Sequence, residues 1–578
     1  MRGSFFMTRF YIPIFLSLIL ILGFSGCDSS DGGPLFTVKT VNLSGLQNED
    51  VYFIFTNPSP VDDAPVAPLV SYSEMTGIED ESRVQQSSQL YKTAVLPSSG
   101  GVIDAQLWKG PDGLSPETGS SFRGSGVSYS YIPPVEVVGT TKVTFRGASS
   151  IDPAESMNIP ATCRGKVDSV DGRTLVIFVA DDCWFDSDVK ENRVDQEMVD
   201  ALIDEFLNAD TGNGIWVWMR DIFGEPWGVP FFSNLIESGA EDYITILLYD
   251  IAVDGNKDDY NSGGIVGYFS SGNNYLESYY QDSNERLMFA MDAVRYADKD
   301  GALWDKTDFW PQSVFSTLAH EFQHMIHYYQ KQIVFDVSSS DTWLNEMCSM
   351  VAEDLLADKI GVAGPRGVDP PTEGSASVPD NCSSSRISTY NYWNNDSLTI
   401  WGGGGDDILR SYASTYAFGA YIARNYGGAA LFRDIVQNGW TDELAVTEAI
   451  AEQGYGIITF KDLLIEWAEA SIISGSIGSV KAYNRGVFVQ SSPTDPDGSG
   501  YNLGSINLYN YDADDGVNNP AGSGPVLYGN ESGTFNPASL EATPPASNVI
   551  FLAGSNLSGD YTWNVEIPTG MVLTVFKK

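Results

Sequence analysis

The sequence predicts an α+β protein in which a segment of mixed helices and strands lies between two β-rich regions. Residues 28–165 carry short apolar runs separated by Gly, Ser and Pro and show no helical period, which is typical of strands joined by long loops. From about 174 to 473, buried-type strands alternate with amphipathic helices. After residue 474 the β pattern returns. We therefore expect four parts, with the boundaries 1–26, 27–165, 166–475 and 476–578.

Composition and charge indicate sizeable cores and an acidic surface. Apolar residues make up 43% and aromatic residues 12% of the 578 residues, and 76 acidic side chains outnumber 32 basic ones, for a net charge of −44. Such a chain repels phosphate backbones, so we expect no nucleic-acid partner. The same acidity favours solubility and carries no information about the fold.

The N-terminus predicts an export signal. The apolar run Phe10–Phe24 is too short to span a membrane and suits the central region of a signal peptide. Small residues then precede Cys27, a pattern that resembles the lipobox of bacterial lipoproteins, although Phe24 stands where Leu is usual. We expect Cys27 to be acylated and to anchor an exported lipoprotein in a membrane of the bacterial cell envelope, either periplasmic or surface-exposed. An uncleaved N-terminal anchor is the alternative.

The remaining cysteines predict disulfides. Setting Cys27 aside leaves an even number, which in an exported chain is compatible with two disulfide bonds. Sequence order favours the pairs Cys163–Cys183 and Cys348–Cys382. Other pairings, and free thiols, remain open.

In the central segment the apolar pattern predicts each element in turn. Residues 175–180 form a continuous apolar run, as expected for a strand buried on both faces. Residues 194–207 place their apolar side chains on one stripe, which predicts an amphipathic helix. A later helix begins near Pro311, because proline is favoured in the first turn. We expect helices at 311–330, 341–358, 412–426, 443–453 and 460–473, and strands at 243–250, 265–269 and 286–292.

The flanking regions carry only strand signals. Residues 361–407 are rich in Gly, Ser and Pro, so we expect a loop there. The expected strands are 51–56 and 135–145 before the central segment, and 549–553, 561–567 and 572–576 after it.

The only three histidines of the chain lie between residues 320 and 327, and they predict a zinc site. His320 and His324 are four residues apart, so on a helix both imidazoles project from one face and can meet one tetrahedral ion. Apolar side chains lie on the opposite face, so we expect the helix to bury its back and present the histidines to a cleft. Glu321 lies beside the metal, where it can take a proton from metal-bound water. Surface histidines on an ordinary helix are the alternative.

His327 is expected to support the site without binding the metal. It lies on the same stripe as His320 but about 10 Å along the helix axis, so one ion is not expected to hold all three histidines. The sequence also lacks the extended motif with a third histidine that is typical of metzincins.

The third ligand must then be a carboxylate or a thiolate. On the next expected helix, Glu346 and Glu353 are seven residues and about 10 Å apart, so only one of them can reach the ion. We favour Glu346, which lies nearer the start of the helix. Cys348 is a further alternative.

Two motifs together resemble a known family. The string His320-Glu321-Phe322-Gln323-His324, followed by Trp343-Leu344-Asn345-Glu346, resembles the gluzincins and within them is similar to the hyicolysin-type zinc peptidases; segments 223–228 and 264–269 add to this likeness. The resemblance covers roughly residues 174–473. It implies a zincin-like catalytic domain, zinc bound by His320, His324 and Glu346, and Glu321 as the general base.

Peptide hydrolysis also needs a donor for the oxyanion. Thermolysin-like enzymes use a histidine there, and no histidine remains in this chain for the role. A tyrosine is the natural substitute, and Tyr412 and Tyr416 lie on a helix that follows the metal segment. We name Tyr416 as the candidate, with a purely packing role as the alternative.

The expected function is that of a zinc-dependent endopeptidase acting on proteins or peptides. An edge strand, for which residues 286–292 are the candidate, would hold substrate as an added strand. Two alternatives remain: a non-enzymatic surface lipoprotein, such as an adhesin that retains a zincin scaffold, and a metal-dependent hydrolase of a different bond.

Overall fold

A computed structural model of the chain shows how these segments pack. It describes residues 36–61, 69–72, 102–103, 132–149, 156–169, 172–208, 210–228, 232–237, 239–251, 253, 255–257, 264–362, 382–402, 406–473, 481–483, 488–494, 500–510, 524–525, 527 and 543–578. Cys27 and the predicted signal peptide lie outside these residues.

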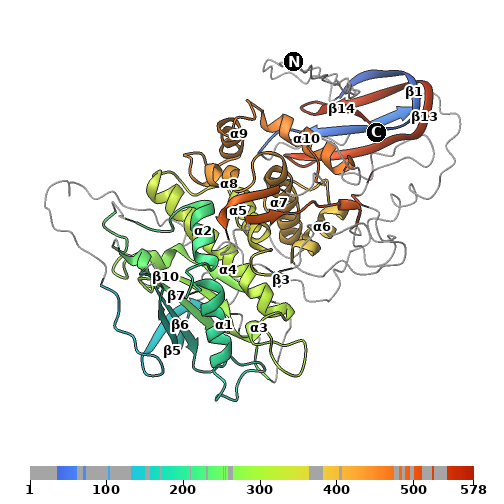
Figure 1. The fold of residues 1–578 in the computed structure, drawn as a ribbon. Coiled ribbons are helices and arrows are strands. Elements are labelled where there is room, and N and C mark those ends of the chain that lie inside the picture. Colours follow the sequence, from blue (N-terminus) through green and yellow to red (C-terminus); the bar gives the residue numbers. More distant parts are fainter. Residues whose placement is uncertain are drawn as a thin grey trace, which may run out of the picture.

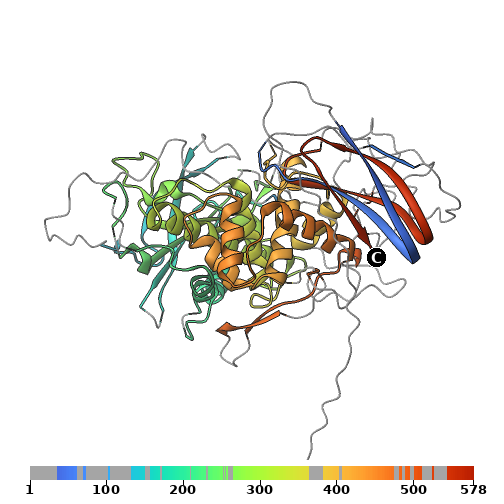
Figure 2. The ribbon, with the colours of Figure 1, turned by 90° about the horizontal axis from the view of Figure 1, so that it is seen from above.

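The molecule has three parts arranged in a row. Figures 1 and 2 show one sheet at one end, a group of helices in the middle and a second sheet, built from the two ends of the chain, at the other end. Helices and strands thus occur side by side, as the α+β prediction required.

The six-stranded sheet has the order β4-β5-β6-β7-β10-β9. Three of its four inner strands, β6, β7 and β10, run parallel, while β4, β5 and β9 are antiparallel to their neighbours. Strands β6 and β7 are buried along almost their whole length, which explains their continuous apolar runs. The bounds are β4 Lys142–Ala148, β5 Ser156–Asp168, β6 Thr174–Ala180, β7 Tyr243–Tyr249, β9 Gly267–Phe269 and β10 Leu287–Asp292.

Two expectations about this sheet were wrong. The strand expected at 286–292 is β10, which lies inside the sheet between β7 and β9, so among the described residues β9 is the edge strand next to it. The boundary expected at residue 165 falls inside β5. β4 pairs with β5 and β5 pairs with β6, so all three strands belong to one sheet. Sequence periodicity identifies strands but not their neighbours.

Helices cover the sheet and build the centre of the molecule. Helix α4, Phe309–Tyr328, packs on β9 and β10 and is buried on nearly all sides. Behind it, the Phe322 ring stacks on Trp216 with centroids 4.8 Å apart and meets Phe289 of β10 edge-on at 5.5 Å. The other helices near the sheet are α1 Gln196–Phe206, α2 Ile215–Phe223 and α3 Ala293–Tyr296.

The central helices pack against α4 from the other side. A Cβ atom at Gly419 of α7 would lie 2.7 Å from Val351 of α5, so these two helices need glycine to approach as closely as they do. Helices α5, α7, α9 and α10 were expected from the sequence, whereas α6 and α8 were not, and α6 lies in the predicted loop. The bounds are α5 Thr342–Leu356, α6 Cys382–Tyr392, α7 Asp406–Asn425, α8 Ala429–Val436, α9 Glu443–Glu452 and α10 Phe460–Ile473.

Helix α4 continues into a π-helical turn, Tyr329–Val334, that ties it to α8. The buried ammonium group of Lys331 donates hydrogen bonds to the carbonyl oxygens of Ile435, at 2.6 Å, and Trp440, at 2.7 Å. It also donates to Asn438. A cation at the carboxyl end of a helix satisfies carbonyls that the helix leaves without partners.

The two ends of the chain form one sheet, with the order β14-β1-β13-β2. Strands β1 and β13 pair from Phe36 with Pro568 to Asn57 with Ser547, so the predicted N-terminal and C-terminal β regions are joined. The sheet has its own core, in which Phe53 meets Trp563 edge-on at 5.5 Å. The bounds are β1 Phe36–Asn57, β2 Leu69–Tyr72, β13 Ser547–Pro568 and β14 Val572–Lys577; two small pairs are β3 Val102–Ile103 with β8 Gly264–Ile265 and β11 Phe488–Thr494 with β12 Gly500–Leu503.

The opposite face of the terminal sheet packs on α10. Tyr52, Ile54 and Ile550 form one buried cluster with Ala468 and Ile472 of that helix. Within the described part of the chain, every helix is too short or too polar to cross a membrane.

Replacing Phe322 with Ala should lower the free energy of unfolding by about 3–5 kcal/mol, because the substitution leaves a cavity between α4 and the sheet. Urea unfolding followed by tryptophan fluorescence would measure the loss. Phe322→Leu, which fills most of the cavity, should cost much less. Equal costs for the two substitutions would contradict this packing.

Candidate metal centre

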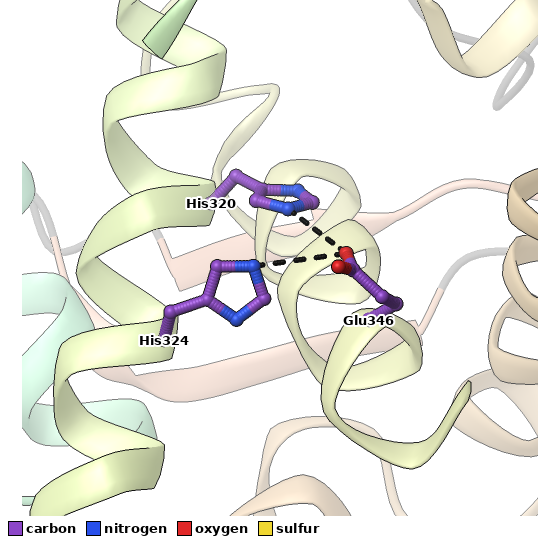
Figure 3. A group of neighbouring side chains, drawn as sticks. All are labelled: His320, His324 and Glu346. Carbon is purple, nitrogen blue, oxygen red and sulfur yellow. Dashed lines mark ion pairs between the residues drawn. The ribbon is translucent and has the colours of Figure 1, made fainter. Parts of the chain in front are cut away.

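Helices α4 and α5 bring three potential metal ligands together. His320 and His324 project from α4 and Glu346 from α5, and Figure 3 shows the three side chains turned toward one another. Glu346 Oε2 lies 3.2 Å from His320 Nε2 and 3.6 Å from His324 Nε2. All three are buried, with 0%, 3% and 0% of their side-chain surfaces exposed.

The hydrogen bonds of His320 determine which ring nitrogen carries its proton. His320 Nδ1 lies 2.8 Å from Glu353 Oε1. That carboxylate also accepts hydrogen bonds from Arg386 at 3.0 Å and Ser316 at 3.1 Å. A carboxylate surrounded by donors accepts from His320, so the ring proton is on Nδ1 and the lone pair of Nε2 faces Glu346.

The same reasoning applies to His324. Its Nδ1 lies 3.0 Å from Asn345 Oδ1 and 2.9 Å from Ser349 Oγ. The hydroxyl proton of Ser349 is already donated to Gln323 Oε1. Both neighbours therefore accept, so the His324 proton is on Nδ1 and the lone pair of its Nε2 also points toward Glu346.

Three electron-pair donors thus converge on one buried point. The ligand atoms of His320, His324 and Glu346 lie within 4.8 Å of one another, and neither histidine Nε2 has a hydrogen-bond partner among the described residues. Buried acceptors that face one another are costly, and positive charge between them, from a proton on His320 or from a bound cation, removes that cost. Two imidazole nitrogens and a carboxylate are the donor set of a catalytic zinc site.

Electrostatics at the two histidines favour a positive charge at this point. Burial and the neighbouring His320 hold the pKa of His324 well below its ordinary value, so its ring is neutral, as a metal ligand must be. Burial also acts to lower the pKa of His320, but the adjacent carboxylates of Glu346 and Glu353 outweigh it and raise that pKa well above its ordinary value. The two carboxylates therefore attract a cation to His320.

Glu321 is held beside the group by the edge strand of the sheet. Its Oε2 accepts a hydrogen bond from the backbone N–H of Phe269, the last residue of β9, at 2.7 Å. The preceding residue, Tyr268, pairs with Ala290 of β10. The outward amide of the edge strand therefore fixes the orientation of the Glu321 carboxylate.

The remaining candidates from the sequence have other partners. Glu353 binds His320 Nδ1 and is not among the three converging ligands. His327 bonds to Gln323 Nε2 and to Ser340 Oγ, as expected for a supporting residue. Cys348 is fully buried, and burial raises the pKa of its thiol to about 12, which removes it as a thiolate ligand.

The disulfide prediction was wrong in this structure. Cys163, Cys183 and Cys348 are buried free thiols. The thiol of Cys163 lies against the Gly165 carbonyl oxygen and that of Cys183 against the Asp182 carboxylate, so the two are directed at different partners. The side chain of Cys382 lies outside the described residues. An even count of cysteines does not show which thiols lie close enough to pair.

The expectation that the histidines face a cleft stays a prediction, and the side chains themselves are buried. His320, Glu321 and His324 are all buried, with at most 3% of their surfaces exposed. Helical periodicity places the polar stripe of α4 on the side away from the sheet. It does not show that α5 covers that stripe.

Tyr416 lies next to Arg386, which donates a hydrogen bond to Glu353 behind His320. It is fully buried on α7, and the guanidinium carbon of Arg386 lies 5.9 Å from the centre of its ring. Tyr412, one turn earlier, packs edge-on against Trp401. The assignment of Tyr416 as oxyanion donor stays a prediction.

Several residues that build the site were missed by the sequence reasoning. Arg386 lies in α6, which has a serine-rich sequence and gave no helical signal. The backbone amide of Phe269 carries no side-chain signature. Gln323 lies inside the first motif and Ser349 lies three residues after Glu346, on the same face of its helix; their position beside the ligands was the signal available for them.

Comparison with known proteins agrees with this geometry. Residues 155–486, more than half of the chain, match the family described as Peptidase M30. A curated relative, the neutral metalloprotease ShpI of Staphylococcus hyicus, is 28% identical over 266 residues, which cover 45% of this chain and 50% of that protein. The chain therefore spans about half the length of this relative.

Zinc analysis of two single variants tests the ligand set. Glu346→Gln should lose the bound zinc, because an amide cannot replace the carboxylate on which both histidines converge. Glu353→Gln should still bind one zinc ion per chain at saturating zinc, because Glu353 contacts only the far side of His320. Atomic absorption after removal of loose metal would measure both. Zinc retained by Glu346→Gln and lost by Glu353→Gln would reverse the assignment.

Proposed function

Because the chain belongs to the Peptidase M30 family, we propose that it is a zinc-dependent endopeptidase that cleaves proteins or peptides with Glu321 as general base. The observation that carries the proposal is the convergence of His320, His324 and Glu346 at one buried point next to the Glu321 carboxylate. The metalloprotease relative supports the same reaction class.

The roles of the residues follow from their contacts. Zinc, when bound, would polarise the scissile carbonyl and lower the pKa of a bound water molecule. His320, His324 and Glu346 would hold the metal, and Glu321 would act as the general base that accepts a proton from the attacking water and returns it to the leaving nitrogen. The hydrogen bond from the Phe269 amide holds one carboxylate oxygen of Glu321 and so fixes the orientation of the proposed base. Tyr416 is our candidate for the oxyanion donor.

We further propose that β9 presents the substrate. Peptides commonly bind zincin-like enzymes as a strand added to the edge of a sheet, with main-chain hydrogen bonds supplying affinity. β9 is the edge strand next to the metal group, and its end residue Phe269 contacts Glu321. A substrate along this strand would pass close to the general base.

Casein hydrolysis by the wild type and by Glu321→Gln tests the peptidase proposal. The variant should bind zinc normally and lose activity by a factor of about 10² to 10⁴, because it lacks the group that accepts the proton. Zinc content and hydrolysis should be measured on the same preparations. If both proteins bind zinc and are equally inert on a broad peptide library, the non-enzymatic adhesin becomes the better hypothesis.

For cellular location we propose an exported lipoprotein anchored through acylated Cys27. The support is the apolar run and the small residues that precede this cysteine. Cys27→Ser should abolish labelling by radioactive palmitate in a bacterial host and move the protein out of the detergent phase in Triton X-114 partition. Unchanged labelling of the variant would contradict the anchor.

A further inference from the structure

A buried arginine lies directly behind the first metal ligand. The Arg386 guanidinium, on α6, donates a hydrogen bond to Glu353 Oε1 at 3.0 Å, and the same oxygen accepts from His320 Nδ1 at 2.8 Å. The side chains of Arg386 and Glu353 are 7% and 2% exposed. The three groups therefore form a continuous chain from α6 to the imidazole on α4.

The chain of hydrogen bonds has only one consistent direction. Arginine can only donate, so Glu353 Oε1 accepts from it. Ser316 donates to the second oxygen, Oε2, at 3.1 Å. With both oxygens accepting from fixed donors, the carboxylate is held in one plane and position, and it holds the His320 ring with Nε2 toward Glu346.

We propose that Arg386 is a positioning residue of the metal centre, which acts through Glu353 to hold the His320 ring in its metal-binding orientation. The inference rests on the proposed zinc site. Groups that orient a metal-ligating histidine typically change metal affinity by 10- to 100-fold when they are removed. Without Arg386, Glu353 loses the donor that anchors Oε1, so the ring of His320 is no longer held in one orientation.

The next residue of α5 supplies a matched comparison. Asp354 pairs with Arg424 of α7 through two hydrogen bonds, at 2.7 and 3.2 Å, and both side chains are 1% exposed. This pair is a buried arginine–carboxylate contact on the same helix. Neither of its members hydrogen-bonds to His320 in the described structure, so it holds α5 in place without orienting a ligand.

Arg386 also reaches a second side of the candidate site. Its guanidinium carbon lies 5.9 Å from the centre of the Tyr416 ring, within the range of a cation–π contact. Arg386 therefore contacts both Glu353, which holds the His320 ring, and Tyr416, the proposed oxyanion donor. This placement favours a role in arranging the site over a role in helix packing alone.

Zinc affinity of the full-length apoprotein tests the proposal. Arg386→Met keeps the length of the side chain and removes its charge, and it should weaken zinc binding by about 10- to 100-fold in competition with a chromophoric chelator. Arg386→Lys keeps a cation and should restore part of that loss. The control Arg424→Met should lower the melting temperature of the apoprotein and leave the zinc Kd within about threefold of wild type.

Cobalt substitution gives a second readout that packing alone would not move. The visible absorption of bound Co²⁺ reports ligand geometry, so it should change in Arg386→Met and in Glu353→Gln and stay the same in Arg424→Met. If Arg386→Met fails to fold, Arg386→Lys and Glu353→Gln carry the same comparison.

Two results would overturn the inference. A wild-type zinc Kd and cobalt spectrum in the Arg386 variants would show that the arginine only packs. An equal loss of zinc affinity in Arg424→Met would show a general effect of disturbing α5. Wild-type protein that binds no zinc would overturn the proposed function as well, whereas zinc-binding wild type with unaffected Arg386 variants would overturn this inference alone.

Discussion

The metal centre depends on one electrostatic constraint: the Nε2 atoms of two histidines and the carboxylate of Glu346 meet at one buried point, where positive charge is needed between them. The hydrogen bonds on the far sides of His320 and His324 place their protons on Nδ1, so each Nε2 faces Glu346 as an acceptor. Such an arrangement is unfavourable in a protein interior unless positive charge lies between the groups, either as a proton on His320, whose pKa is raised, or as a bound cation. The surrounding structure must hold the three side chains in this arrangement.

Much of the packing around α4 and α5 holds the side chains of the metal centre in place. Phe322 anchors the back of α4 in an aromatic cluster against the sheet. On the other side, Gly419 lets α7 approach α5 closely, and two buried arginines pair with consecutive acidic residues of α5. Breaking a buried ion pair costs more than forming it gains, so such pairs specify one arrangement of the helices more than they stabilise the fold.

The sequence predicted the parts of the fold and the site that depend on local periodicity. The i, i+4 spacing of His320 and His324 has a meaning on any helix, and the apolar stripes identified α1, α4, α5 and α10 within a few residues. The pairing of strands that are far apart in the sequence produces no comparable local pattern. β1 and β13 are about 500 residues apart in the chain, and nothing in either strand identifies the other as its partner.

The predictions that failed did so because they depended on tertiary contacts. Arg386 lies in a serine-rich segment with little helical signal, whose helix α6 packs against α7, so neither the helix nor its contact with Glu353 could be inferred. The edge position of β9 depends on which strand lies beside β10. Two distant supports therefore meet on α4: β9 holds the carboxylate of Glu321, while α5 and α6 hold the ring of His320. Since the base and the ligand are adjacent residues of one helix, a shift of α4 relative to either support would disturb proton transfer and metal binding together.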